Sequence, residues 1–201
     1  MTSIHIVGDS ISIQYGPYLE RYCAGVLDYT RKEGRYASLD VPEGANAGDS
    51  SKLRSYLSDC CELAQRWDVL VINCGLHDIK TDPACGTRQV DEADYEKNLN
   101  AILALAARLA KRTIWVRTTP VVDAIHNERS KDFHRYAADQ QHYNAIADAV
   151  MAAAQVTVLD LETFTRRCGG DEIFRDHVHF IDSVRELQGA WLAGALGSLL
   201  G

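Results

Sequence analysis

The stretch DVLVIN, residues 68–73, is the clearest strand in the sequence. Apolar residues follow one another without a break between Asp68 and Asn73, and polar and apolar positions do not alternate. An unbroken apolar run is typical of a central parallel strand that is covered on both faces. The stretch therefore predicts a parallel sheet with helices on both sides.

Short apolar runs alternate with longer helical patterns on either side of this strand. The predicted strands are residues 4–7, 36–41, 68–73, 113–118 and 156–161, of which 36–41 is the weakest. The predicted helices are residues 11–27, 51–65, 95–111, a long segment ending near 154, and 184–200. Five strands separated by helices predict an α/β fold, a three-layer α/β/α sandwich around a five-stranded parallel sheet.

The composition fits one globular domain over residues 1–201, since 46% of the residues are hydrophobic and 24% are charged. The net charge of -7 argues against non-specific binding to nucleic acid or to anionic membranes, which needs a positive field. No apolar run is long enough to span a bilayer, so no membrane insertion is expected. The six cysteines form no C-x-x-C pair, and reduced thiols in a cytoplasmic protein are the simpler interpretation.

In a parallel α/β sheet, the functional site lies beyond the carboxyl ends of the strands. Small or polar residues follow each predicted strand at that edge: Gly8-Asp9-Ser10, Asn46-Ala47-Gly48-Asp49, Asn73 to Asp78, Thr118-Thr119-Pro120, and Asp176 to Phe180. A serine, histidines, carboxylates and candidate N–H donors are therefore expected at one face of the protein.

This ordered set of segments resembles the SGNH hydrolases, also called the GDSL family of esterases and lipases. The matching blocks are Gly8-Asp9-Ser10, the glycine of Asn46-Ala47-Gly48, Gly75-Leu76-His77-Asp78, and Asp176 to His179. Each block is a weak signal alone, but four in family order form a strong one. The resemblance implies the flavodoxin-like SGNH hydrolase fold and no metal or organic cofactor.

Ser10 is the candidate nucleophile, and it needs a base because a free hydroxyl is a poor nucleophile. His179 is the candidate base, since an imidazole titrates near neutral pH. Asp176, three residues earlier, would hold the imidazole in the correct tautomer and stabilise the imidazolium. His177 is the rival base, but its spacing to Asp176 is less favourable.

The resemblance also implies an oxyanion hole made by the N–H of Ser10, the N–H of Gly48 and a side chain of the third block. The family has asparagine where this chain has His77. A neutral imidazole donates one N–H, and a protonated one donates with a charge. We expect His77 to replace the asparagine as donor.

Other residues of these segments are expected to be structural. Asp9 and Asp78 would hold their loops near the site, and Asp160 would tether a loop after the fifth strand. Ser10 by itself would also fit a plain helix N-cap. Arg117 and the stretch 126–135 either line the mouth of a pocket or form a solvated face.

The expected function is a serine esterase that hydrolyses a carboxylic ester through an acyl-enzyme, with a small-molecule ester carrying a short acyl or acetyl group as substrate. A thioesterase or lysophospholipase with the same triad stays open, as does a non-catalytic domain that binds acyl groups or carbohydrate. A further alternative is a metal phosphoesterase, with Asp176, His177 and His179 joined by His77 and Asp78 around an ion.

Overall fold

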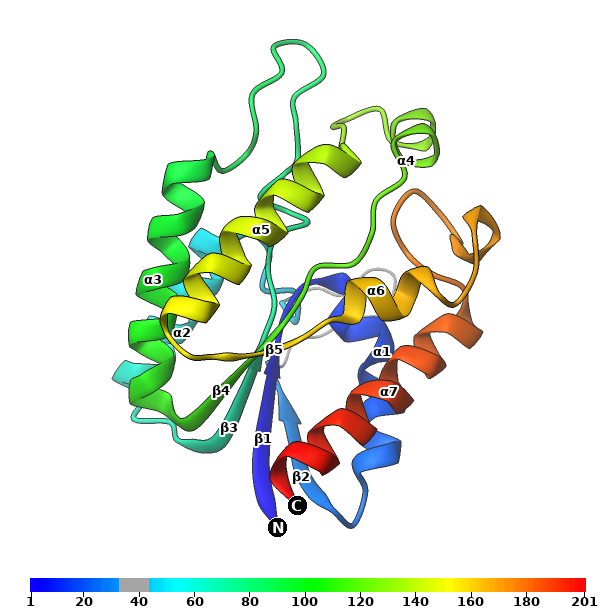
Figure 1. Ribbon diagram of the computed structural model, residues 1–201. Coiled ribbons are helices and arrows are strands. Elements are labelled where there is room, and N and C mark those ends of the chain that lie inside the picture. The colour runs from blue at the N-terminus through cyan, green and yellow to red at the C-terminus, as the bar shows by residue number, and fades with distance from the viewer. Residues whose placement is uncertain (33–43) are drawn as a thin grey trace.

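The computed structural model describes residues 1–32 and 44–201, and its α/β architecture is the predicted one (Figure 1). In the described residues five strands form one sheet in the order β2-β1-β3-β4-β5, and every neighbouring pair is parallel. The strands are β1 (Thr2–Val7), β2 (Leu27–Arg31), β3 (Trp67–Ile72), β4 (Ala110–Val116) and β5 (Thr157–Leu159).

Helices cover both faces of this sheet, as a parallel sheet requires. The helices are α1 (Ser10–Cys23), α2 (Ser50–Glu62), α3 (Glu92–Leu109), α4 (Asp123–Arg129), α5 (Ala137–Ala153), α6 (Leu161–Arg166) and α7 (Asp182–Leu200), with a short 3₁₀ turn, η1 (Asp171–Ile173). On one face α1 packs against α7, and on the other α3 packs against α2 and α5 (Figure 1).

Strands β1 and β3 lie side by side and end together, because Val7 pairs with Ile72. Residues Val69 to Ile72 are each at most 2% exposed, so β3 is covered on both faces as predicted. The N–H of Asn73 donates to the carbonyl of Val7 at 3.0 Å. The residues that follow the two strands therefore leave the sheet next to each other.

The second strand differs from the prediction. The predicted strand 36–41 lies outside the described residues, and the strand that pairs with β1 is β2, Leu27–Arg31. The predicted helix 11–27 is too long, because α1 ends at Cys23 and Gly25 takes a φ of +78° that turns the chain back. Burial alternates along β2, since it is an edge strand with one face exposed, and this pattern is too short to stand out in the sequence.

Three short elements were also absent from the prediction. Helix α4 lies between the predicted strand 113–118 and the long helix that follows it, and α6 begins within the predicted fifth strand, 156–161. The strand β5 stops at Leu159 because Asp160 caps α6 by accepting the N–H of Thr163 at 3.0 Å. The third short element, η1, has three residues, too few for a periodic pattern.

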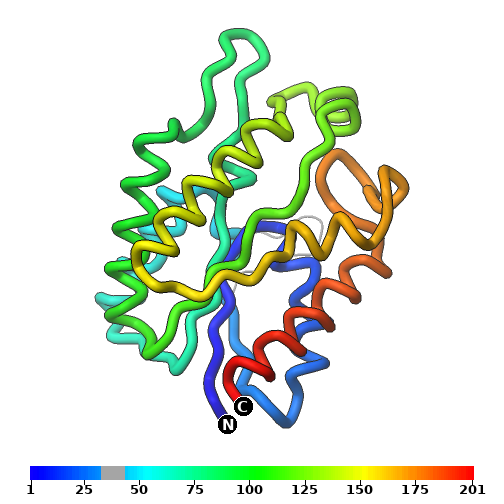
Figure 2. Tube along the Cα trace, viewed as in Figure 1, coloured from blue at the N-terminus to red at the C-terminus, as the bar shows by residue number. Residues whose placement is uncertain are grey.

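The connection from β3 to α3 rises above the helices as a hairpin, seen at the top of Figure 2. Thr81 forms antiparallel bridges with Arg88 and with His134, so the hairpin is tied to the segment between α4 and α5. This contact brings Lys80 and the residues after His134 to the same end of the sheet.

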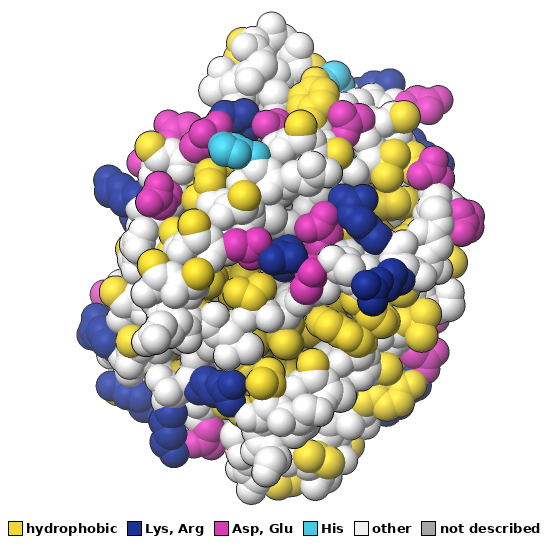
Figure 3. All heavy atoms as spheres, in the orientation of Figure 1, with side chains coloured by type: hydrophobic (Ala, Val, Ile, Leu, Met, Phe, Trp, Pro, Cys, Tyr) yellow, Lys and Arg dark blue, Asp and Glu magenta, His cyan; other side chains and the backbone are white. Residues whose placement is uncertain are grey.

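Charged side chains of both signs are scattered over the face seen in Figure 3, with apolar side chains between them. In the described part of the chain, no helix has both the length and the apolar character to cross a membrane.

Candidate active site

Ser10 is the first residue of α1 and lies directly beyond the end of β1. Asp9 is the N-cap, and its side chain accepts the N–H of Ile11 at 3.0 Å. Gly8 allows the tight passage from strand to helix, since a Cβ there would lie 2.9 Å from Ser12. Within residues 1–32 and 44–201, the N–H of Ser10 donates to no group, as expected for the first turn of a helix.

The structure brings Ser10, His179 and Asp176 together in a hydrogen-bonded chain. The Nε2 atom of His179 lies 2.7 Å from Oγ of Ser10, and its Nδ1 atom lies 2.8 Å from Oδ2 of Asp176. Burial alone would raise the pKa of Asp176, but hydrogen bonds from the His179 ring and from the N–H groups of His179 and Val178 hold it well below its usual range. The ionised carboxylate only accepts, so Nδ1 carries the proton and Nε2 accepts from Ser10.

The loop that carries Asp176 and His179 is fixed at both ends. Phe174 and Phe180 form an antiparallel bridge, and the N–H of Arg175 donates to the carbonyl of His179 at 2.8 Å. Phe180 is fully buried. The buried ring anchors the loop, so the imidazole beside it is held toward Ser10.

His177 lies in the same loop but points elsewhere. Its Nδ1 atom is 3.8 Å from Oδ1 of Asp176, and its ring packs edge-on against His126 with 4.8 Å between centroids. Among the described residues it makes no hydrogen bond to Ser10. The geometry of a base is therefore found at His179 and not at His177.

Gly48 comes to the same edge of the sheet, because the N–H of Ala47 donates to the carbonyl of Gly8 at 2.9 Å. Gly48 has a φ of +68°, which favours glycine, and a Cβ there would lie 2.8 Å from Cδ of Lys52. Its N–H donates to Oδ1 of Asn46 at 2.8 Å. The N–H that we expect to be an oxyanion donor thus lies at this edge, and it already has an acceptor inside its own loop.

His77 lies in a turn that Gly75 makes possible, since a Cβ on Gly75 would lie 2.6 Å from Oγ1 of Thr118. Burial, followed by the charges of Lys80, Arg135, Lys52 and His179, lowers the pKa of His77 to about 3. The ring is therefore neutral near pH 7 and has one N–H to donate. Neither ring nitrogen has a hydrogen-bond partner within the described ranges.

Asp78 turns away from the site and ties two segments together. Both of its carboxylate oxygens accept the N–H of Ser50, at 2.9 and 3.1 Å. Burial raises the pKa of Asp78 to about 7, although these hydrogen bonds oppose the effect. Asp78 thus holds the turn that carries His77 against the start of α2.

A family model of GDSL-like lipases and acylhydrolases matches residues 6–183. The chain belongs to this family. No curated protein matches it. Among solved structures, it is similar to a lipase/acylhydrolase from Enterococcus faecalis, with 19% identity, a TM-score of 0.74, and coverage of 100% of this chain and 98% of that one.

Two further solved structures resemble this GDSL-like hydrolase in fold. One is an aryl esterase from M. smegmatis, with 16% identity, a TM-score of 0.71, and full coverage of both chains. The other is a carbohydrate acetylesterase from Sinorhizobium meliloti, with 13% identity, a TM-score of 0.66, and full coverage of both chains. At these identities the likeness shows the fold, which agrees with the expected SGNH architecture.

The hydrolase has one residue near the site that the sequence did not single out, Arg135. The sequence places it only within the stretch 126–135, but the side chain is 3% exposed. Its Nε donates to the carbonyl of Leu76, next to His77, and the charges of Asp9 and Asp176 reach it. An arginine in a loop usually lies in solvent, so the sequence carries no signal for its burial.

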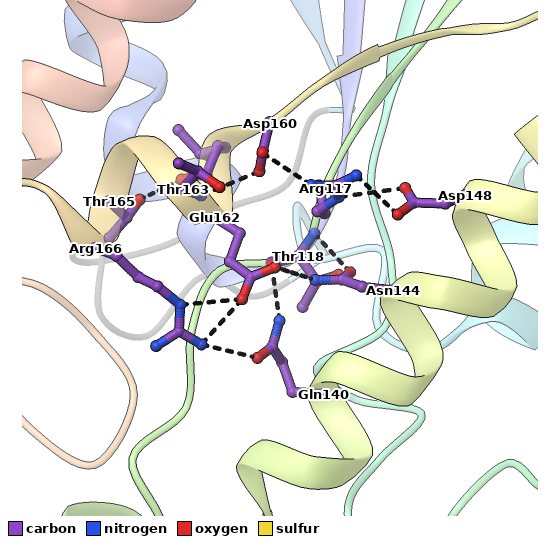
Figure 4. Close-up of polar contacts among 11 residues, drawn as sticks. Arg117, Thr118, Gln140, Asn144, Asp148, Asp160, Glu162, Thr163, Thr165 and Arg166 are labelled. Carbon is purple, nitrogen blue, oxygen red and sulfur yellow. Dashed lines mark hydrogen bonds and ion pairs between the residues drawn. The ribbon is translucent and has the colours of Figure 1, made fainter.

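Arg117 and Asp160 lie in a different cluster, beyond β4 and β5 (Figure 4). Arg117 pairs with Asp148 at 2.7 Å and with Asp160 at 2.8 Å, and Arg166 pairs with Glu162 at 2.9 Å. We call these residues the paired cluster. Asp160 tethers its loop, as the sequence suggested, and Arg117 is bound by carboxylates and is not free in solvent.

In the part of the chain that the structure describes, there is no ion site of the kind that the metal phosphoesterase alternative requires. No group of His, Cys, Asp or Glu side chains there is placed to hold an ion together. Asp78 accepts from Ser50, and Asp176 is bonded to His179, so the two carboxylates proposed for that shell are already engaged.

Proposed function

We propose that this hydrolase is a serine esterase that cleaves a carboxylic ester through an acyl-enzyme on Ser10. The observation that carries the proposal is the continuous chain from Ser10 to His179, at 2.7 Å, and from His179 to Asp176, at 2.8 Å. A nucleophile, a base and a group that orients the base are the parts that acyl transfer by serine needs. Membership of the acylhydrolase family supports the same chemistry.

In the first step, Nε2 of His179 takes the proton of Ser10 while Oγ attacks the carbonyl carbon of the ester. The tetrahedral intermediate collapses, the bond to the alcohol oxygen breaks, and the imidazolium returns its proton to that oxygen. Water then attacks the acyl-enzyme with His179 again acting as base. The acid leaves and Ser10 regains its proton.

The negative charge on the carbonyl oxygen needs donors aimed at it. The unpartnered N–H of Ser10 and the neutral ring of His77 are the two that the geometry supports best. The N–H of Gly48 joins them when the oxyanion takes the place of Asn46 as its acceptor. Asp9 and Asp78 act by fixing the loops that carry these donors.

A short acyl group, such as an acetyl ester on a sugar, is our proposed substrate. The structural neighbours include a carbohydrate acetylesterase and an acetyl xylan esterase. In this reading, thioesterase and lysophospholipase activities are the competing outcomes, because the same three residues perform the acyl transfer in each.

The test combines labelling of the active serine with a panel of esters. A fluorophosphonate probe should label the wild-type chain and the Ser12→Ala variant, which loses a neighbouring hydroxyl of α1, but not Ser10→Ala. Acetyl and octanoyl nitrophenyl esters, with an acyl thioester and a lysophospholipid, then rank the substrates. A folded wild-type chain that is not labelled and hydrolyses none of them would support a non-catalytic binding domain instead.

A further inference from the structure

The guanidinium of Arg135 is buried beside the proposed site and is held only by neutral groups. Its Nε donates to the carbonyl of Leu76, and its Nη1 lies 2.9 Å from Nε2 of His126. His126 places its other nitrogen 3.1 Å from Oδ1 of Asn127, so Nδ1 carries the proton and Nε2 accepts from Arg135. Burial and the charge of Arg135 lower the pKa of His126 to about 3, which keeps this ring neutral.

No carboxylate within the described ranges lies at ion-pair distance from Arg135. The carboxylates of Asp9 and Asp176 reach it only as longer-range charges, and Oδ1 of Asp9 and Oδ2 of Asp176 are bonded to Ile11 and His179. Its Nη2 has no hydrogen-bond partner there either. Burial lowers the pKa of Arg135 to about 10, so it still carries its charge near pH 7. A buried charge without a close partner is costly, and such a charge is usually balanced by a counter-ion or a ligand.

Two lysines extend this positive region toward the proposed oxyanion donors. Nζ of Lys80 lies 4.5 Å from the ring centroid of Phe133, and Cζ of Arg135 lies 4.9 Å from the same ring. The side chain of Lys52 lies against Gly48. We call Arg135, Lys80 and Lys52 the unpaired cluster, since none of them has a salt bridge in the described part of the chain.

The unpaired cluster is unusual in a chain with a net charge of -7, because the protein as a whole repels anions. The cations around His77 therefore attract an anionic group only over a short distance, once a substrate has entered the site. A guanidinium presents two parallel N–H groups that fit a carboxylate or a phosphate. The Nη2 of Arg135 is available for that contact, and the lysines add charge around it.

We propose that the hydrolase selects esters that carry a negative charge close to the ester carbonyl, with Arg135 as the main anion-binding residue and Lys80 and Lys52 in support. This inference rests on the proposed esterase function and names its substrate class. The shared chemistry is an anionic group within reach of Arg135. It can belong to the acyl part or to the alcohol part of the ester, and the experiment separates the two.

The experiment compares kcat/KM for matched pairs of esters. For the acyl side, the pair is 4-nitrophenyl hemisuccinate and its neutral methyl ester, and for the alcohol side it is acetylated glucuronic acid and acetylated methyl glucoside. The wild-type enzyme should prefer the anionic member of at least one pair by about tenfold or more, which corresponds to about 1.4 kcal/mol. Arg135→Gln should abolish this preference.

The variants Lys80→Gln and Lys52→Gln keep the test independent of the folding of Arg135→Gln, because both lysines are less buried. Each should reduce the preference about threefold. The matched control is Lys111→Gln, which removes a lysine that pairs with Asp68 at the amino ends of the strands. This variant should keep the wild-type preference.

The failure of this inference is distinct from failure of the proposed function. Hydrolysis of neutral and anionic esters at equal rates would overturn the anion preference and leave the esterase intact. If no ester is hydrolysed, calorimetric binding of both members of each pair to Ser10→Ala still decides the matter. Equal affinity for the two members would overturn the inference, and tighter binding of the anionic member would support it.

Discussion

Two groups of basic side chains lie beyond the carboxyl ends of the strands, and they differ in what balances their charge. In the paired cluster, Arg117 lies between Asp148 and Asp160 and is 24% exposed (Figure 4). In the unpaired cluster, Arg135 is 3% exposed and no carboxylate of the described residues pairs with it. The more deeply buried cation is therefore the one without a counter-ion.

The charge of the paired cluster stabilises the fold, whereas we assign the charge of the unpaired cluster to substrate binding. The charge of a paired arginine such as Arg117 is balanced by carboxylates of the fold. A buried arginine held by a carbonyl and an imidazole keeps both its charge and a free donor. A charged residue at a strand end thus indicates a binding site only where no opposite charge of the fold balances it.

The largest expected effect compares two carboxylates, one at each cluster. Asp176→Asn should lower kcat about 10³- to 10⁴-fold, because the amide no longer holds His179 in the tautomer that accepts the Ser10 proton. Asp160→Asn, in the paired cluster, should leave kcat within about twofold. Steady-state kinetics on one ester measures both. Equal losses in the two variants would contradict the separation of the clusters.

The next effect concerns His77, whose ring is surrounded by the unpaired cluster. His77→Ala should lower kcat about 10²- to 10³-fold through loss of an oxyanion donor, and His77→Asn should restore most of it. Because burial lowers the pKa of His77 to about 3, the ring is neutral at all working pH values. The pH profile of kcat in His77→Asn should therefore match that of wild type.

A profile that falls toward low pH in wild type but is flat in His77→Asn would assign the titration to His77 and contradict this account. Full activity in His77→Ala would remove this residue from the oxyanion site.

The parts of the fold that the sequence predicts well are those with a strong physical pattern. The unbroken apolar run of β3 needs burial on both faces, and that need alone implies a parallel sheet. The four blocks of the family fix the order in which Ser10, Gly48, His77 and His179 come to one edge. By contrast, β2 is a short edge strand with one face exposed, and its pattern is too weak to distinguish it from the end of a helix.

The parts of the site that the sequence does not predict depend on contacts between distant segments. Burial of Arg135 results from its bonds to Leu76 and His126, and neither bond follows from local sequence. The engagement of the Gly48 N–H by Asn46 is a local turn, but a sequence motif records the glycine and not its partner. Arg117 and Arg135 therefore look alike in sequence and differ only in the folded chain.

His5, in β1, sharpens the comparison, because it is buried, no carboxylate of the described residues pairs with it, and it has no role in the proposed site. Its Nδ1 and Nε2 atoms lie 2.9 Å from Oγ1 of Thr30 and from the hydroxyl of Tyr56. Burial, with the charge of Arg31, lowers the pKa of His5 to about 4. Both ring nitrogens have partners, so this ring, unlike Arg135, has no donor left for a ligand.

The lowered pKa of His5 makes stability depend on pH in a defined direction. Between about pH 6.5 and pH 4 the unfolded chain binds a proton at His5 and the folded chain does not, so stability falls as the pH is lowered. The loss from this residue should approach about 2–3 kcal/mol near pH 4. Urea unfolding of wild type and His5→Asn at both pH values measures it, and an unchanged pH dependence in the variant would contradict this account.

The smallest expected effect tests whether the paired cluster serves only the fold. Arg117→Gln removes two ion pairs that join β4 to α5 and to the start of α6. Since these groups are partly exposed, the free energy of unfolding should fall by only about 0.5–1.5 kcal/mol, measured by urea unfolding. The preference for anionic over neutral esters should stay within about twofold of wild type, because the charge of Arg117 is already balanced by two carboxylates. A loss of that preference as large as in Arg135→Gln would mean that paired and unpaired arginines act alike on the substrate, and the distinction between the two clusters would no longer identify the binding site.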